Sequence, residues 1–340
     1  MTTEDASLSE RPATIGDVAR LSGFATSTVS RALSNPTRVN AHTREKILAA
    51  ARELSYTPNA QAQALTSGQT RAVAVLVSDI TNPFYFGLIR GTQQQLKAAD
   101  YMQMLVDTAE SGESEAATIG SLRRSADGAI LTASRLSDQQ LAAVAARMPL
   151  VTINRLAPDI PSVVIDTPLG IDQALDHLAS LGHRRITYIS GPNSSWSNER
   201  RWLRMEKSAT KLGVEAVRSR EYSPDMSSGA AAAEAMINST STACIVFNDL
   251  LAIGMLERFR ERGVRVPEDV SVVGCDDIFG ADFCNPPLTT LTAPIERAGR
   301  VAVSMLLARL SAGPNTPAGQ SVLLPTHLTV RKSTGPAPQR

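Results

Sequence analysis

The stretch Thr14–Leu33, which reads TIGDVARLSGFATSTVSRAL, has the spacing of two short helices joined by a tight turn. Ala19 is small enough for the helices to approach, Gly23 suits the turn, and Val29 can lock the second helix against the first. We therefore predict a helix-turn-helix. Its second helix carries Thr26–Arg31 (TSTVSR), where hydroxyls and one arginine suit phosphate oxygens and base edges of DNA. The alternative is a small three-helix bundle that binds no ligand.

The flanking residues predict the limits of three helices. Thr14 is a suitable N-cap for the first helix, with Asp17 in a capping-box position, and Asn40 is a suitable cap for a third helix at residues 41–54. The second helix is expected from about Thr26 to Leu33. On the first helix we expect four residues to face inward: Ile15, Val18, Ala19 and Leu21.

Residues 58–71 read as a linker that contains a short helix-forming segment. Pro58 and Asn59 end the third helix, and Ala60–Leu65 consists of good helix formers. Six residues are too few for a stable helix in water, so this segment should order only when something holds it. In the plainer interpretation it is an ordinary linker and Leu65 packs against the rest of the protein.

The composition predicts a folded chain of two or three domains. A length of 340 residues exceeds one small domain, and 43% hydrophobic residues are ample for packed cores. The net charge of +1 hides an excess at residues 13–71, where seven basic residues face three acidic ones. This positive excess lies in the segment predicted to read DNA. A helix bundle with a solvated basic face would have a similar charge, so the charge alone does not decide between the two. Residues 1–12 are polar, and we expect them to be disordered.

The cysteines and the hydropathy pattern bear on location and on metals. Three widely spaced cysteines, Cys244, Cys275 and Cys284, include no CxxC pair, so we expect neither a zinc site nor a disulfide framework. The N-terminus has no apolar core typical of a signal peptide, and no run of about 18 apolar residues predicts a membrane span. We expect a cytoplasmic protein without cofactor, metal or membrane contact.

From Arg71 onward, apolar runs typical of buried parallel strands alternate with helical patterns. This pattern predicts an α/β core of two doubly wound parallel-sheet lobes, joined to an all-α helix-turn-helix domain at 13–57. We expect the core at 72–332, with an N-lobe at about 72–168 plus 293–322 and a C-lobe at about 169–292 plus 323–332. A tail at 333–340 is expected to be disordered. The expected strands are 72–77, 128–131, 150–153, 186–190, 244–247 and 270–274, and the expected helices include 87–99, 170–181, 228–238 and 252–262.

Ligands of such sheets bind beyond the carboxyl ends of the strands, and polar motifs of this chain follow those ends. Phe84 can stack on the apolar face of a sugar ring, and Arg155 adds a donor that would suit an anionic ligand. Each residue also has a plain structural role, Phe84 in the core and Asp276 as a cap at a strand end. Other motif positions at these ends are 78–84, 191–201, 248–249 and 276–277.

Several motifs occur in an order that resembles one family. The DNA-reading half contains TIGDVA at 14–19, STVSRAL at 27–33, TREKI at 43–47 and YTPN at 56–59. The core contains SDITNPF at 78–84, LGHRRI at 181–186, ND at 248–249, VGCDDI at 273–278 and PPLTT at 286–290. Together they resemble the LacI-type bacterial repressors, over roughly residues 13–332. Each motif alone is weak evidence, but their common order is specific.

The resemblance implies which residues contact DNA. Thr26 and Ser27 match the pair that contacts bases, Arg31 follows one turn later, and Leu65 matches a residue that wedges into the minor groove. Ala25 stands where the family usually has a serine just before this helix. The N-cap of the helix is therefore lost or passes to Thr26. The remaining expected DNA contacts are Thr14, Ile15, Thr28, Ser30, Ser34, Arg38, Asn40, Thr43, Tyr56, Asn59 and Ala62.

The same resemblance implies a bacterial protein associated with the nucleoid, whose core is similar to periplasmic binding proteins and has an effector site between the lobes. Arg201 matches the arginine that holds the effector, Asn248 its amide partner and Asp276 its carboxylate, a set that suits the hydroxyls of a polyol. Pro224 stands at a position where the family often has an aromatic residue that lines the pocket. The expected effector-binding residues are Asp79, Phe84, Arg155, Arg201, Asn248 and Asp276.

The function that follows is a homodimeric repressor that binds pseudo-palindromic operator DNA and is controlled by a sugar or related metabolite. A dimer is needed because one reading helix contacts only a half-site. Regulation by a co-repressor and activation are alternatives within the family, and a stand-alone sugar-binding protein is a less favoured one. We expect no catalytic residues, because the sequence contains no GxGxxG, P-loop or nucleophile-elbow motif.

Overall fold

The computed structural model describes residues 12–34, 38–57, 68–312 and 319–339. The chain divides into two compact units at residues 1–70 and 71–340. Within the described ranges, no helix has the length and apolar character that would let it cross a membrane.

The first unit is a bundle of α1 (Ile15–Ser22), α2 (Thr26–Ser34) and α3 (Ala41–Glu53). The predicted capping box is present, since Thr14 accepts from Asp17 N and the Asp17 side chain accepts from Thr14 N. Gly23 ends α1 at φ 75°, in the left-handed region that glycine adopts without strain. Asn40 caps α3 by accepting from His42 N. The buried centre is made of Val18, Val29, Ala32, Ile47, Ala50 and Ala51.

One inward-facing prediction for α1 is wrong. The side chain of Leu21 is 46% exposed, because it lies at the edge of the bundle beside a surface hollow that Glu53 and Leu54 also line. Ile15 and Ala19 do pack against the buried centre, as expected from their helical spacing.

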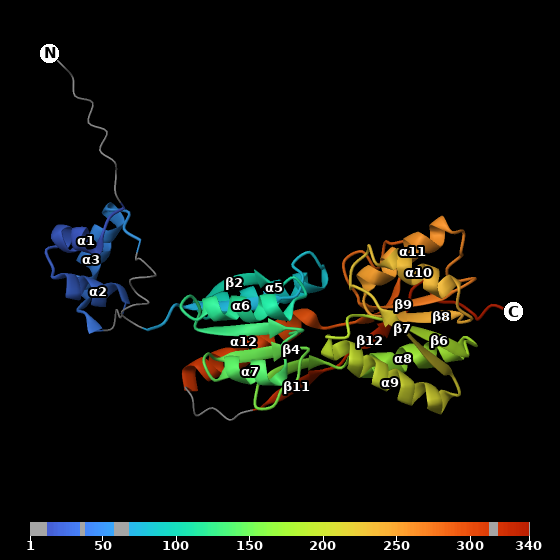
Figure 1. Cartoon of the computed structure of the whole chain (residues 1–340). Helices are drawn as coiled ribbons and strands as arrows, with labels where there is room; N and C mark the ends of the chain where they lie inside the picture. Colours follow the sequence, from blue (N-terminus) through green and yellow to red (C-terminus); the bar gives the residue numbers. More distant parts are fainter. Residues whose placement is uncertain (1–11, 35–37, 58–67, 313–318, 340) are drawn as a thin grey trace, which may run out of the picture. The chain divides into compact units, whose positions relative to one another are not determined.

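In the second unit, the N-lobe is built on an all-parallel sheet in the order β11-β5-β4-β3-β1-β2. Alternate residues of its buried strands pack against α5 and α12 on one face and against α6 and α7 on the other (Figure 1). The strands are β1 (Ala72–Val77), β2 (Met102–Asp107), β3 (Gly128–Thr132), β4 (Leu150–Ile153), β5 (Ser162–Ile165) and β11 (Ser321–Leu324). The helices are α5 (Phe84–Ala98), α6 (Gly112–Leu122), α7 (Asp138–Ala145) and α12 (Ile295–Ala312).

The C-lobe repeats this architecture with the order β12-β10-β9-β8-β6-β7, in which only β12 is antiparallel to its neighbour. Helices α8 and α9 cover one face, and α10 and α11 cover the other. The strands are β6 (Arg185–Ser190), β7 (Glu215–Glu221), β8 (Ala243–Val246), β9 (Ser271–Asp276), β10 (Thr289–Thr292) and β12 (His327–Thr329). The helices are α8 (Thr167–Ser180), α9 (Trp196–Leu212), α10 (Gly229–Ile237) and α11 (Asp249–Glu261).

The chain crosses between the lobes three times, after β5, after β10 and after β11. Two of the crossing segments are tied together, because Thr326 Oγ1 donates to Thr292 O at 2.6 Å. β11 pairs with β5 as far as Leu324, so the N-lobe sheet extends two residues beyond the approximate boundary expected at 322.

The expectation of a disordered tail at 333–340 is wrong for residues 333–339. Ser333 is buried, and its side chain donates to Val272 O at 2.6 Å. Gly335 N donates to Ser271 Oγ, and Ala337 N donates to Leu181 O. The buried His183 ring also hydrogen-bonds to Gly335 O at 3.1 Å. These bonds hold the two-proline segment against the C-lobe although it is neither helix nor strand.

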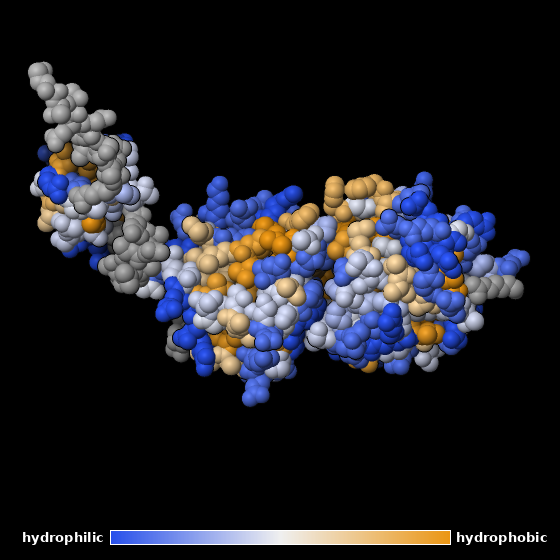
Figure 2. All heavy atoms as spheres, turned by 45° about the horizontal axis from the view of Figure 1, so that its top comes forward, coloured by the Kyte–Doolittle hydropathy of each residue, from blue (hydrophilic) through white to orange (hydrophobic). Residues whose placement is uncertain are grey.

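Apolar residues reach the surface of both lobes on the face that Figure 2 presents. Among the exposed large hydrophobic side chains, Phe279 and Phe283 stand out at 75% and 64% exposure. Their rings are in edge contact, with centroids 5.1 Å apart, in the segment that follows β9. Phe86 of α5 is 49% exposed. Exposed aromatic pairs of this kind are unusual on the surface of a monomer.

Candidate functional site

Helix α2 presents a polar face away from the centre of the first unit. Val29 and Ala32 are buried, whereas Thr26, Ser27 and Arg31 are exposed. The carbonyl of Ala25 accepts from Thr28 N at 2.8 Å and Val29 N at 3.0 Å, which makes Ala25 the N-cap residue. Alanine has no side-chain acceptor, so the cap of this helix is lost and does not pass to Thr26.

The other predicted DNA-contact residues differ in their exposure and in whether they already cap a helix. Thr14 and Asn40 cap α1 and α3, and Tyr56 is half-buried against the bundle centre with Ile15. Arg38 is exposed, whereas Thr28, Ser30 and Thr43 are half-buried. The Ser34 side chain lies outside the part of the chain that the structure describes, as do Asn59, Ala62 and Leu65.

In the second unit a cavity of about 50 Å³ lies between the carboxyl ends of the two parallel sheets. That volume holds a few water molecules but no sugar ring. Four of the six predicted effector residues line it, namely Phe84, Arg201, Asn248 and Asp276. The other lining residues are Ser78, Asn82, Tyr85, Glu110, Ala133, Arg135, Asn154, Ser195, Ser197, Pro224 and Phe247.

Arg201 of α9 is buried at the floor of this cavity. Its Nε donates to Thr167 Oγ1 at 3.1 Å and its Nη1 donates to Phe247 O at 2.6 Å. The guanidinium carbon also lies 5.2 Å from the centre of the Phe247 ring, within cation–π distance. Gly191 permits this arrangement, because a Cβ there would come within 2.4 Å of the Phe247 ring.

Asp276 ends β9 and lines the cavity together with Arg201. Burial raises the pKa of Asp276 to about 8, although the Arg201 charge acts in the opposite direction, and Asp249 adds to the rise. Burial likewise raises the pKa of Asp249 to about 6, against the opposing effect of the Thr290 hydroxyl bonded to it at 2.6 Å. Two neighbouring carboxyl groups with raised pKa values are typical of a ligand site.

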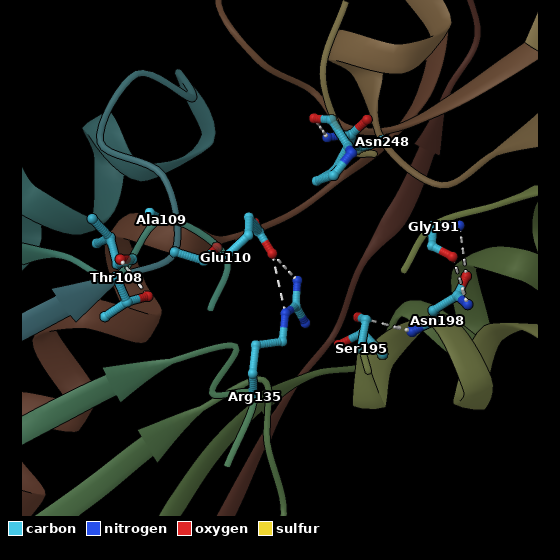
Figure 3. A network of polar contacts seen from close by, with 12 residues as sticks. Thr108, Ala109, Glu110, Arg135, Gly191, Ser195, Asn198 and Asn248 are labelled. Carbon is cyan, nitrogen blue, oxygen red and sulfur yellow. Dashed lines mark hydrogen bonds and ion pairs between the residues drawn. The ribbon is translucent and has the colours of Figure 1, made fainter. Parts of the chain in front are cut away.

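Asn248 and Asn198 have different roles in the same region. Asn248 caps α11 by accepting from Leu251 N, and its Nδ2 donates to Pro224 O at 2.8 Å at the cavity wall. Asn198 is fully buried and does not line the cavity. Its amide bonds to Gly191 N and O, and its own N–H donates to Ser195 Oγ, which fixes the loop before α9 (Figure 3).

The structure does not bring Asp79 and Arg155 into the cavity. Asp79 Oδ1 accepts from Thr81 N at 2.8 Å and from Thr81 Oγ1 at 2.6 Å, so its side chain shapes its own turn. Arg155 pairs with Asp138 at 2.6 Å and donates to Leu136 O, at the start of α7. The sequence argument for an anionic ligand, which depended on Arg155, therefore loses its basis.

Sequence reasoning missed a charged pair on the N-lobe side of the cavity. Glu110 and Arg135 both line it and form an ion pair across the ends of β2 and β3 (Figure 3). Nearby, the Tyr85 hydroxyl hydrogen-bonds to Ser78 Oγ at 2.7 Å. The signal was present in outline, because both charged residues follow strand ends, but they are 25 positions apart in the chain.

Comparison with known proteins agrees with both units. A model of bacterial regulatory proteins of the lacI family matches residues 14–59, and a periplasmic binding protein-like domain matches residues 175–334. The chain is 32% identical to the HTH-type transcriptional regulator DegA of Bacillus subtilis (strain 168), over 95% of this chain and 98% of that protein.

This chain belongs to the lacI family of bacterial transcriptional regulators. Solved structures agree with the assignment. A lac repressor dimer bound to operator and the anti-inducer ONPF has a TM-score of 0.85 and 29% identity, with 96% of this chain and all of that chain covered. A complex of the transcriptional regulator CelR with cellobiose has a TM-score of 0.70 and 30% identity, over 95% of this chain and all of that one.

The family assignment confirms the predicted fold and the predicted class of function. The helix-turn-helix unit and the two-lobe α/β core are those of lacI-family regulators, and the protein is a DNA-binding transcriptional regulator. The relatives named above are regulators and not enzymes.

Proposed function

We propose that this regulator is a homodimeric repressor whose affinity for operator DNA is controlled by a small molecule bound between the core lobes. The observation that carries the proposal is the presence, in one chain, of an exposed polar face on α2 and a buried polar cavity between two sheets. A repressor bound to operator is among its structural relatives. The protein would act in the cytoplasm without a cofactor and would catalyse no reaction.

For DNA, we propose that Thr26, Ser27 and Arg31 read base edges in the major groove. All three are exposed on α2, and Arg31 can bridge O6 and N7 of guanine. The N-termini of α1 and α3 would contact phosphates through those first-turn N–H groups that the Thr14 and Asn40 side chains do not already cap. In the linker at 58–71, we propose that Leu65 wedges into the minor groove and that Asn59 and Ala62 also contact DNA.

For the effector, we propose Arg201, Asn248, Asp276 and Phe84 as binding residues. Arginine donates, the carboxyl group accepts from hydroxyls, and the amide does both. A relative with this fold binds cellobiose, which supports a sugar or sugar derivative as the ligand. Because the cavity of about 50 Å³ is smaller than a sugar ring, the lobes must part about the three crossing segments to admit it.

The test is binding of fluorescently labelled DNA from upstream of the protein's own gene, with and without a panel of sugars, nucleosides and their phosphates. We expect specific binding in the nanomolar range at moderate salt and release by one compound. Tightening by a compound would assign a co-repressor system. Absence of specific DNA binding under every condition would contradict the proposal.

Two variants separate the two sites. Arg31→Ala should lower the preference for operator over unrelated DNA by about 10- to 100-fold and leave ligand binding unchanged. Asp276→Ala should bind operator normally and no longer respond to the ligand. Loss of both activities in either variant would indicate misfolding, which thermal unfolding detects.

A further inference from the structure

Glu110 occupies a position that the loop between β2 and α6 holds rigidly. Thr108 N donates to Val77 O at 2.9 Å, Ala109 N to Asp107 Oδ1 at 2.8 Å, and Glu110 N to Ser78 O at 2.7 Å. Ala109 and Glu110 have φ values of 51° and 56°, in the left-handed region that costs non-glycine residues energy. Strain of this kind persists where surrounding bonds fix the backbone and often marks a functional position.

Arg135 then fixes the direction of the Glu110 side chain. Its Nε donates to Glu110 Oε2 at 3.1 Å, and its Nη2 pairs with the same oxygen (Figure 3). The Arg135 side chain is only 5% exposed, and its backbone N–H donates to the buried Glu115 at 2.9 Å. Both bonds end on Oε2, so Glu110 Oε1 makes no hydrogen bond within the described ranges of the chain.

The cavity is therefore lined by one acid and one base from each lobe. Glu110 and Arg135 come from the N-lobe, and Asp276 and Arg201 from the C-lobe. Arg135 is committed to Glu110, and two donors of Arg201 are committed to Thr167 and Phe247. An anionic group on the N-lobe side of the cavity would face the Glu110 carboxylate, because the nearby Arg135 is already paired with it, and like charges at this distance repel.

We propose that Glu110, oriented by Arg135, is the N-lobe recognition group for the effector and selects an uncharged ligand with neighbouring hydroxyls over phosphorylated or carboxylated molecules. A carboxylate only accepts hydrogen bonds, so a fixed Oε1 is complementary to one or two hydroxyl donors. Phe84 and Tyr85 of the same lobe supply apolar ring faces beside it. This inference rests on the proposed function, because it assumes that the cavity is the effector site.

The test uses the full-length protein and isothermal titration calorimetry. The probes are cellobiose, ribose, a set of further neutral sugars, the nucleosides, and the phosphorylated and carboxylated counterparts of each. For wild type, we expect a neutral compound to bind at least about tenfold more tightly than its phosphorylated counterpart. Sugars and nucleosides share the neighbouring hydroxyls, and the two arms of the panel distinguish them.

Glu110→Gln should weaken binding of the neutral ligand by about 10- to 100-fold, because a charge-assisted hydrogen bond is lost. It should also reduce the discrimination against the phosphorylated form. Glu113→Gln is the matched control, since Glu113 is exposed on α6 and does not line the cavity, and it should behave as wild type. Circular dichroism and thermal unfolding verify that both variants are folded.

The outcomes separate this inference from the proposed function. Unchanged affinity in Glu110→Gln, or tighter binding of an anionic compound by wild type, overturns the inference while a ligand-responsive regulator remains. Binding of no compound, neutral or charged, would count against both.

Discussion

At the scale of single residues, the environment of Asp276 makes its charge state sensitive to pH near neutrality. Its pKa is raised to about 8, mainly because burial disfavours the ionised form, so the folded protein holds a proton that the unfolded chain has released. For an acid with a raised pKa, the resulting stabilisation is present below the unfolded pKa of about 4 and is lost as the pH rises through about 8.

We expect Asp276→Asn to expose this linkage without any ligand. The melting temperature of wild type should fall relative to that of Asp276→Asn as the pH rises from 6 to 9, because only wild type must release the buried proton. Asp249 is present in both proteins, so the difference largely cancels its contribution. Differential scanning calorimetry at several pH values provides the measurement. A difference that stays constant or reverses with pH would show that Arg201 keeps Asp276 ionised.

Individual positions also show which residues of the cavity could be predicted from the sequence and which could not. Arg201, Asn248, Asp276 and Phe84 follow strand ends or begin helices, and a family resemblance suffices to group them. Glu110 and Arg135 were missed because each is an ordinary charged residue in a loop. Their pairing depends on β2 and β3, the strands on either side of β1, ending at the same edge of the sheet, and on a left-handed backbone at Glu110. Asp79 and Arg155 do not line the cavity in this structure, because each side chain bonds to local partners.

At the scale of helices and strands, full burial made some strands predictable but not all, since the fully buried β5 was not predicted. β1 and β4 were predicted with the correct bounds, because their apolar runs are buried at every position. The edge strands β2 and β7 have exposed or half-buried side chains at every position, and neither strand was predicted. α5 begins at Phe84, three residues before its predicted start, since Asn82 Oδ1 accepts from Phe84 N and stabilises the first turn.

Glycines of two N-lobe helices offer a prediction at this scale. A Cβ on Gly91 of α5 would come within 2.2 Å of Glu296 O, the backbone of α12, whereas nothing lies within 4 Å of a Cβ on Gly120 of α6. Gly91→Ala should therefore cost about 1–3 kcal/mol of unfolding free energy through overpacking. Gly120→Ala should stabilise by about 0.5–1 kcal/mol, because alanine favours the helix. Urea unfolding measures both, and equal effects of the two changes would contradict the close packing of α5 on α12.

At the scale of the whole molecule, the three crossings between the lobes connect the cavity to the rest of the fold. The crossing after β5 leads directly into α8, whose Thr167 accepts from Arg201, and the crossing after β10 leads into α12. A ligand that contacts Arg201 on one lobe and Glu110 on the other must change the separation of the lobes about these crossings. The sequence predicted the two lobes but not the small volume of the cavity, since that volume depends on how the completed lobes meet.

The largest exposed aromatic pair, Phe279 and Phe283, leads to a prediction about assembly. These rings are 75% and 64% exposed and in mutual contact, and a half-site reader must pair with a second copy to hold a palindromic operator. The double variant Phe279→Ala/Phe283→Ala should shift the solution mass from twice the chain mass to one chain. Operator affinity should fall by at least about 100-fold, since each monomer then binds one half-site alone.

Leu323→Ala is a suitable control, because Leu323 is 62% exposed but lies on β11 of the N-lobe. Sedimentation velocity and DNA titration measure both effects. A double variant that remains dimeric would place the contact between copies elsewhere, whereas a monomer with wild-type operator affinity would remove the need for a dimer altogether.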